Sequence, residues 1–212
     1  MKFPKILSIL LHPIFIPTFV MLVLLHEVEF FNILLSNYKK TLIIIMVIFT
    51  IVLPIIILLL LLKLARIKSL EMETVKERNL PLFYTILMMI IGFSFFKKIA
   101  FLSVHLCSIY LSGIIVLIIA FLITKKWKIS LHMLGVGAAL GSLINMNIVF
   151  GNLFNWILGL IVISGLLAYS RLELKAHNKK QIYAGFGLGC VLQSTLILYF
   201  SLNFSVNSIF FN

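Results

Sequence analysis

Apolar runs long enough to cross a lipid bilayer recur along nearly the whole of this chain. A spanning helix needs roughly 20 mainly apolar residues, and in lipid only helices and closed barrels satisfy all their backbone hydrogen bonds. Of the 212 residues, 62% are hydrophobic and 11% are charged, whereas soluble domains are about half apolar and a quarter charged. Seven apolar runs are found, at 6–25, 41–62, 82–96, 103–124, 133–150, 152–169 and 182–201. The chain is therefore predicted to be all-α, a polytopic membrane bundle of about seven transmembrane helices in a single domain, 1–212.

The limits of three runs depend on particular residues. The first run is interrupted by Pro13 and has no small-residue cleavage site after it, so it is predicted to stay as a span and not to be removed as a signal peptide. The third run is short, and it extends past Lys97 and Lys98 if their long side chains reach the membrane surface. Residues 151–152, a Gly followed by an Asn, predict a tight turn between the fifth and sixth spans.

Basic residues gather on one side of the predicted membrane. The N-terminus and the loops 63–81, 125–132 and 170–181 fall on that side, and they hold 14 of the 18 Lys and Arg residues. The others are Lys39, Lys40, Lys97 and Lys98. Because cytoplasmic loops carry an excess of Lys and Arg, the N-terminus and the three basic loops are predicted to be cytoplasmic, with the C-terminus outside an inner (cell) membrane.

The net charge of +12 limits the classes of partner. The charges sit in short loops between apolar runs and form no soluble basic domain, which excludes a nucleic-acid-binding domain. Anionic lipid headgroups and phosphate substrates are the partners that such loops favour. Cys107 and Cys190 lie in apolar segments without metal-ligand neighbours, so both are interpreted as packing thiols.

Three segments on the basic side hold residues suited to binding and transferring phosphate. They read Lys76-Glu77-Arg78-Asn79-Leu80-Pro81, then Lys128-Ile129-Ser130-Leu131-His132, then Ser170-Arg171 followed by His177 and Gln181. The guanidinium groups of Arg78 and Arg171 can bind phosphate oxygens in pairs. Ser130 offers a hydroxyl, with free N–H groups beside it if a helix begins there. His132 and His177 allow one nucleophile and one general acid–base, and phosphoryl transfer needs little more than positioning and charge neutralisation.

In these positions the chain resembles the type 2 phosphatidic acid phosphatase superfamily, membrane lipid phosphatases related to the vanadium haloperoxidases. That family carries a Lys, six residues and Arg-Pro; then Pro-Ser-Gly-His; then Ser-Arg, five residues, His, three residues and Asp. The third motif is matched with its spacing intact, the second in two positions and the first loosely. The matching residues are Ser170, Arg171 and His177; Ser130 and His132; and Arg78 with Pro81. The resemblance implies a phosphatase-like core of six helices at about 60–201, with one extra helix.

The resemblance also implies an enzyme, a phosphoric monoester or diphosphate hydrolase that uses no cofactor or metal and acts on a lipid or polyprenyl phosphate. By this resemblance His177 is the nucleophile that forms a phosphohistidine. His132 protonates the leaving alkoxide and then activates water. Arg78, Arg171 and Ser130 hold the phosphate oxygens.

Several positions depart from the family pattern. Ile129 and Leu131 replace the Pro and Gly of the second motif, and the side chain of Leu131 could crowd a bound phosphate. Gln181 stands in place of the Asp that orients the nucleophilic histidine. Its carbonyl oxygen can accept the imidazole N–H, but it cannot offset an imidazolium charge. Glu173, four residues before His177, could replace that Asp if the stretch is helical.

Other interpretations stay open. The departures favour a catalytically weak or inactive relative that binds a lipid headgroup or a membrane partner. A small transporter would need polar or charged residues at mid-membrane, and few are found. Lys76 is a further candidate phosphate ligand, although Glu71 stands at the family's Lys spacing. His12, about one turn into the first span on the basic side, is either an interfacial or a functional residue. The glycines of 135–141 indicate close helix packing, since no strand precedes them as in a nucleotide-binding loop.

Overall fold

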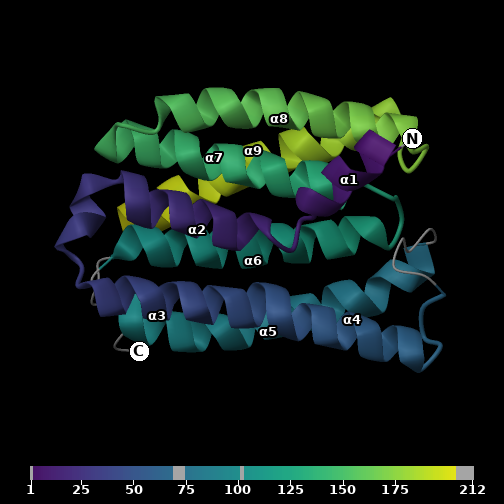
Figure 1. Ribbon diagram of the computed structural model, residues 1–212, viewed down its shortest axis with the longest axis horizontal. Helices are drawn as coiled ribbons and strands as arrows, with labels where there is room; N and C mark the ends of the chain where they lie inside the picture. Colours follow the sequence, from purple (N-terminus) through teal and green to yellow (C-terminus); the bar gives the residue numbers. More distant parts are fainter. Residues whose placement is uncertain (1, 69–74, 101–102, 204–212) are drawn as a thin grey trace.

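The computed structural model describes residues 2–68, 75–100 and 103–203, and every regular element in these ranges is helical (Figure 1). The elements are α1 (Lys2–Leu10), α2 (Ile16–Glu27), the 3-10 helix η1 (Glu29–Ile33), α3 (Ser36–Val47), the π-helical segment η2 (Ile48–Val52), α4 (Leu53–Lys63), α5 (Val75–Ile99), α6 (Val104–Thr124), α7 (Leu131–Phe150), α8 (Phe154–Glu173) and α9 (Lys179–Asn203). The all-α prediction is confirmed for this part of the chain.

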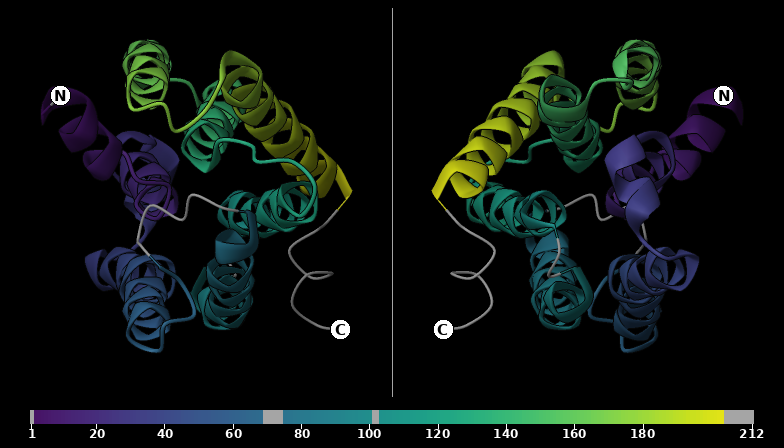
Figure 2. Two further views of the ribbon diagram at one scale, coloured as in Figure 1. Left: turned by 90° about the vertical axis from the view of Figure 1, so that its right-hand side faces the viewer. Right: turned by 90° about the vertical axis from the view of Figure 1, so that its left-hand side faces the viewer.

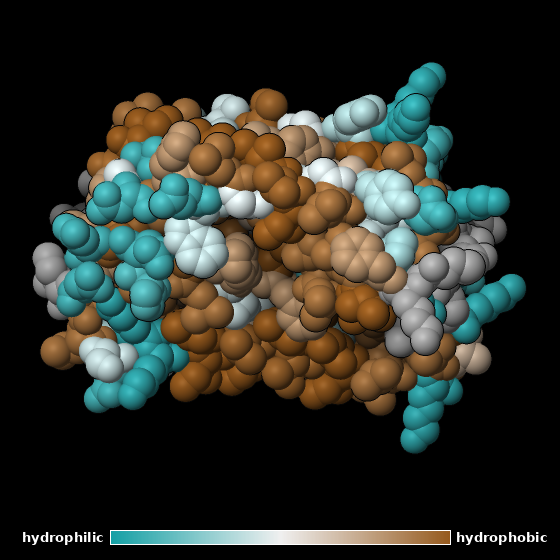
Figure 3. All heavy atoms as spheres, turned by 45° about the horizontal axis from the view of Figure 1, so that its top comes forward, coloured by the Kyte–Doolittle hydropathy of each residue, from teal (hydrophilic) through white to brown (hydrophobic). Residues whose placement is uncertain are grey.

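Among the residues that the structure describes, six helices are long and apolar enough to cross a membrane. One is formed by α3, η2 and α4 together, and the others are α5, α6, α7, α8 and α9. On the face drawn in Figure 3, hydrophobic residues form a broad band between two hydrophilic ends. Lipid can solvate such a band and water cannot, so the length and composition of these helices are those of a membrane protein.

The predicted first span at 6–25 is broken, so an unbroken seventh span is not confirmed. Two short helices, α1 and α2, stand in its place, and neither is long enough to cross a bilayer alone. Pro13 explains the break, because it has no N–H to donate to the carbonyl oxygen of Ile9 and disfavours a helical conformation in the residue before it. That oxygen accepts from the N–H of His12 instead, at 3.2 Å.

Other helix ends agree with the sequence in part. The turn at 151–152 has positive φ angles of 75° and 63°, as a tight connection requires. Lys97 and Lys98 lie in the last turn of α5, so the third span extends past them as predicted. The start of α5 differs from the predicted one: the helix begins at Val75, so Arg78 lies in its first turn and not in a loop.

The helices run side by side along the longest axis of the molecule (Figure 1). Seen along that axis, α6 lies between the group of α3, α4 and α5 and the group of α7, α8 and α9 (Figure 2). The start of α1, the ends of α4, α6 and α8, and the starts of α5, α7 and α9 lie together, on the right in Figure 1. We call this the basic end, since the three basic segments 76–81, 128–132 and 170–181 gather there. The last turn of α9 lies at the opposite end.

Helices α7 and α9 pack with their backbones in direct contact. A Cβ atom at Gly137 would overlap the carbonyl oxygen of Phe186, and one at Gly189 would overlap that of Leu134. Glycine allows helices in lipid to approach this closely, which favours association where apolar burial contributes little. The close-packing interpretation of the glycines is confirmed at Gly137.

Polar side chains inside the bundle reinforce this contact. Gln193 of α9 donates from Nε2 to the carbonyl oxygen of Ile109 in α6 and to the hydroxyl of Ser142 in α7, both at 3.1 Å. Asn145 of α7 donates from Nδ2 to the hydroxyl of Ser194 in α9, at 2.9 Å. Hydrogen bonds of this kind join membrane helices, so these buried polar groups hold α6, α7 and α9 together.

We expect Gly189→Ala to destabilise the bundle, because the added Cβ overlaps the carbonyl oxygen of Leu134 and forces α9 away from α7. Overpacking of this kind costs about 1–3 kcal/mol. Gly187→Ala is the matched control, since it adds the same methyl group to the same helix with no atom within 4 Å. Thermal unfolding of the purified protein in detergent should show a lower midpoint for Gly189→Ala alone. Equal midpoints for the two variants would contradict the close α7–α9 contact.

Candidate functional site

The start of α7 meets the start of α9 at the basic end. Ser130 is fully buried and is the N-cap of α7, where its hydroxyl accepts from the N–H of Met133 at 3.5 Å. The N–H of Ser130 donates to the carbonyl oxygen of Gln181 at 3.3 Å. Gly185 permits this approach, because a Cβ there would lie 2.6 Å from the carbonyl oxygen of Ser130. The second and third sequence motifs are therefore joined through the backbone.

A tight turn after α8 directs the chain back to this contact. The N–H of Ala176 donates to the carbonyl oxygen of Arg171 at 3.2 Å, and the N–H of Lys175 to that of Leu172 at 2.9 Å. This pattern is a Schellman motif, with Lys175 in the left-handed conformation at φ 51°. Since α8 ends here, residues 176–178 can turn toward the start of α7.

Gln181 holds the ring of His177 while it caps α9. Its side-chain oxygen accepts from the N–H of Asn178 at 3.2 Å, and Asn178 Oδ1 accepts from the N–H of Gln181 at 3.0 Å, which is a capping box. A backbone N–H can only donate, so the Gln181 atom at this position is the oxygen. The same oxygen lies 3.0 Å from Nδ1 of His177. In the neutral ring, Nδ1 therefore carries the proton and Nε2 the lone pair.

Three positive side chains act on His177, which is 7% exposed. Burial first, and then the charges of Arg78, Arg171 and Lys128, lower the pKa of His177 from 6.5 to about 4, against the opposing effect of its hydrogen bond. Arg78 is itself buried, and its Nη1 donates to the carbonyl oxygen of Ile129 at 3.3 Å. The first motif is thus attached to the second, and His177 is a neutral imidazole beside cations at pH 7.

His132 bonds to α1 and lies near the other motif residues. Its Nε2 is 3.0 Å from the carbonyl oxygen of Ser8 and 3.3 Å from the hydroxyl of the same residue. A carbonyl oxygen can only accept, so Nε2 of His132 carries a proton. Arg171 donates from Nη1 to the Ser8 hydroxyl at 2.7 Å. His132 also interacts electrostatically with Arg171 and His177, so the two predicted catalytic histidines belong to one site.

A third imidazole, that of His12, adjoins this site. Its ring meets the ring of His132 edge-on, with 5.1 Å between the centroids. Nδ1 of His12 accepts from the N–H of Ile14 at 3.3 Å, so a neutral His12 carries its proton on Nε2. The break between α1 and α2 therefore places His12 beside the candidate acid–base.

Two further residues predicted for the site, Lys76 and Glu173, are not shown to belong to it. The side chain of Lys76 lies outside the part of the chain that the structure describes, so its role as a phosphate ligand stays a prediction. Glu173 is exposed and is the last residue of α8. Because the helix ends there, the stretch from Glu173 to His177 is not helical, and the condition under which Glu173 could replace the family's Asp is not met. Gln181 makes that contact instead.

Two residues of the site were missed by sequence reasoning. Ser8 lies in an apolar run with no motif around it, and only the packing of α1 against α8 brings it to Arg171. Lys128 stands two residues before Ser130, in one of the three basic segments, and its charge acts on His177. Its position in that segment could have identified it as a residue of the site.

The side chains at the basic end suit an anion better than a metal ion. Within residues 2–68, 75–100 and 103–203, no three His, Cys, Asp or Glu side chains are placed to hold a metal together. Arg78, Arg171 and Lys128 supply guanidinium and ammonium groups, which bind phosphate through short charge-assisted hydrogen bonds.

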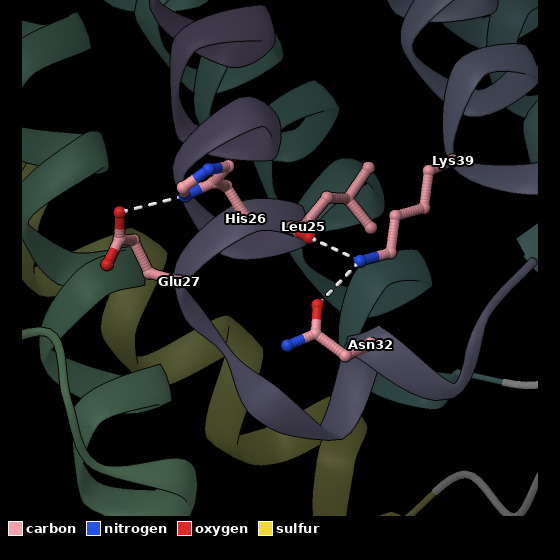
Figure 4. A network of polar contacts seen from close by, with 5 residues as sticks. All are labelled: Leu25, His26, Glu27, Asn32 and Lys39. Carbon is pink, nitrogen blue, oxygen red and sulfur yellow. Dashed lines mark hydrogen bonds and ion pairs between the residues drawn. The ribbon is translucent and has the colours of Figure 1, made fainter. Parts of the chain in front are cut away.

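Two adjoining hollows lie at the opposite end, away from these residues. The larger, of about 430 Å³, is lined by Leu22, Leu25, His26, Asn32, Lys39 and Ile43. In Figure 4, Lys39 donates to the carbonyl oxygen of Leu25 at 2.9 Å and to Oδ1 of Asn32 at 2.8 Å. Lys39 thereby ties the start of α3 to the end of α2 and to η1. Its charge serves the fold at this place.

We expect His177 to make folding stability depend on pH. The unfolded chain binds a proton to His177 below about pH 6.5, whereas the folded protein does so only below about pH 4. Stability from this residue is therefore complete above pH 6.5 and is lost as the pH falls from 6.5 to 4. Thermal midpoints in detergent, measured from pH 7 to pH 4, should fall less steeply for His177→Gln than for the unaltered protein.

The control for this measurement is His26→Gln, since His26 is exposed at the opposite end beside Glu27 (Figure 4). It should reproduce the pH dependence of the unaltered protein. Parallel curves for His177→Gln and the unaltered protein would show that His177 is not held neutral by its surroundings.

The chain matches no known family, no curated protein and no solved structure.

Proposed function

We propose that this protein is a membrane phosphatase that removes phosphate from a lipid phosphate or diphosphate through a phosphohistidine intermediate. One observation supports this most strongly: His177 is buried and neutral, and Gln181 holds it with the Nε2 lone pair available, while Arg78 and Arg171 act on it electrostatically. A neutral, oriented imidazole that also feels the charge of two guanidinium groups has the properties of a nucleophile toward a phosphate ester.

The first step of the proposed reaction is attack by Nε2 of His177 on phosphorus. The new N–P bond forms as the P–O bond to the lipid breaks, and protonated His132 gives its proton to the departing alkoxide. Arg78 and Arg171 neutralise the phosphate oxygens, and the free N–H groups at the start of α7 add positive potential beside Ser130. The hydrogen bond from Nδ1 of His177 to Gln181 is kept throughout this step.

The second step returns the site to its initial state. His132, now neutral, takes a proton from water, and the oxygen of that water attacks phosphorus. The N–P bond breaks, inorganic phosphate leaves, and His177 recovers its lone pair. Gln181 accepts a hydrogen bond from the ring without adding negative charge, so it supports the imidazole tautomer but stabilises positive charge on His177 less than a carboxylate would.

A second candidate is a catalytically weak or inactive relative that binds a lipid headgroup or a membrane partner. It is favoured by hydrogen bonds that the site residues make within the chain: Arg78 donates to Ile129, and both His132 and Arg171 are bonded to Ser8. The absence of a carboxylate at position 181 favours it as well.

We expect purified protein in detergent to release inorganic phosphate from phosphatidate, phosphatidylglycerophosphate or a polyprenyl diphosphate, including in the presence of a chelator. His177→Ala should lower release by at least about a thousandfold, because it removes the nucleophile. His26→Ala, at the opposite end, is the matched control and should keep full activity. Full activity in His177→Ala would refute the assigned nucleophile.

Gln181→Asp separates the two candidates. If the unaltered protein releases no phosphate from any lipid while Gln181→Asp does, the site binds headgroups and has lost catalysis with its carboxylate. If the unaltered protein is active, the phosphatase proposal stands.

We also propose that the basic end faces the cytoplasm of the cell in which the protein lies in the inner membrane. The excess of Lys and Arg at this end supports the orientation. The N-terminus and the last turn of α9 lie at opposite ends, so the C-terminus would be outside. An alkaline phosphatase fused to the C-terminus should then be active, whereas a fluorescent protein fused there should not fluoresce. The reverse result would invert the orientation.

A further inference from the structure

Helix α1 lies over the candidate site with a polar contact on its inner face. Pro4 and Ser8, one turn apart, are buried, and Ser8 is 7% exposed. Phe3, Ile6 and Ile9 are between 54% and 59% exposed on the outer face. The helix packs against α8 at the basic end (Figure 1). Its outer face is thus suited to lipid, and its inner face separates the bilayer from Arg171 and His132.

The break at Pro13 leaves the carbonyl oxygen of Ser8 available to the site. In a continuous helix this oxygen would accept from the N–H of His12. That N–H donates to Ile9 instead, at 3.2 Å, since Pro13 has no N–H for Ile9. The Ser8 oxygen is then one of the unpaired carbonyls at a helix end, and Nε2 of His132 donates to it at 3.0 Å.

The two oxygens of Ser8 therefore accept hydrogen bonds from Arg171 and His132, the same groups that the proposed reaction uses to bind phosphate and to protonate the leaving oxygen. Arg171 donates to the hydroxyl at 2.7 Å, which is the length of a charge-assisted bond to a phosphate oxygen. His132 holds its Nε2 proton toward the carbonyl oxygen, where the proposed mechanism requires a proton for the leaving oxygen. A phosphate ester bound to Arg171 and His132 would occupy the space that Ser8 fills.

We infer that Ser8 occupies the position that the substrate phosphate takes when it binds. A lipid phosphate that enters from the bilayer then binds by displacing Ser8, and α1 with it, from Arg171 and His132. This inference rests on the proposed function for the identity of the ligand. The substrate it favours is a membrane-embedded phosphate ester, because such a molecule reaches Arg171 from the lipid side that α1 covers.

The first test measures binding of orthovanadate, a phosphate analogue, to the full chain in detergent, without turnover. Ser8→Ala removes the hydroxyl that Arg171 binds, and it should lower the dissociation constant about tenfold. Ser94→Ala is the matched control, since Ser94 is an exposed serine of α5 whose hydroxyl donates to the carbonyl oxygen of Ile90 in its own helix. This variant should bind vanadate as the unaltered protein does. Unchanged or weaker binding in Ser8→Ala would overturn the inference.

The second test follows the position of α1 directly. In a variant with Cys107 and Cys190 replaced by Ala, Ser8→Cys places a thiol on the buried face of α1. Saturating vanadate should raise its rate of reaction with a maleimide several-fold, while Phe3→Cys, on the exposed face, should react at one rate with and without vanadate. Protection of the Ser8→Cys thiol by vanadate would overturn the inference.

These outcomes are distinct from those of the phosphatase assay. Phosphate release from lipids together with unchanged vanadate binding in Ser8→Ala would leave the enzyme proposal standing and remove Ser8 from it. Tighter vanadate binding in Ser8→Ala without release from any lipid would support the displacement of Ser8 and refute the catalytic proposal. Absence of vanadate binding in both proteins would overturn the inference, whatever the phosphatase assay gives.

Discussion

The direct backbone contact between α7 and α9 determines the geometry of the basic end. Lipid tails are as apolar as the side chains facing them, so helices in a membrane associate through close packing and hydrogen bonds. Gly137 and Gly189 provide the packing, and Gln193 provides bonds to both α6 and α7. At the end of this helix pair, the N–H of Ser130 reaches the carbonyl oxygen of Gln181. The N-terminus of α7 and the turn that carries His177 are therefore fixed relative to one another by main-chain atoms.

Gln181 both caps α9 and orients the ring of His177, and it does so without the negative charge that a carboxylate would bring. As the third residue of α9 it completes a capping box, and with the same oxygen it accepts from His177. A carboxylate would do both and would also attract a proton to the ring. The neutral amide leaves burial and the nearby cations to dominate, which agrees with the low pKa of His177, about 4. The surroundings of His177 thus favour its neutral imidazole form.

The sequence predicted the fold class, six of its seven spans and the gathering of basic segments at one end, because these depend on hydropathy and loop charge alone. It failed where tertiary or local backbone geometry decides the result. The segment 6–25 is apolar enough to predict a continuous span despite Pro13, so the break between α1 and α2 was not predicted. Glu173 was aligned with His177 because the end of α8 depends on a left-handed Lys175, in a position where glycine is the usual signal.

The site shows the same division. His132, His177, Arg78 and Arg171 come together as the motif spacing indicated, since two spans separate the second and third motifs and return the chain to one end. Ser8 could not be predicted, because it reaches His132 through the packing of a short helix, without any spacing that relates it to a motif. The sequence left His12 as either an interfacial or a functional residue, since no spacing relates it to His132 either.

The break between α1 and α2 divides the N-terminal segment into two parts of unequal stability. Met21 and Leu24 of α2 are almost fully buried in the core, and Lys39 fastens the far end of that helix to η1 and α3. In α1, by contrast, most apolar side chains face outward. The free energy of opening α1 therefore depends on its polar contacts, on its packing against α8 and on the surrounding lipid, and less on the core that holds α2. Bilayer thickness and headgroup composition can thus shift the population of an open N-terminus while the other helices keep their arrangement.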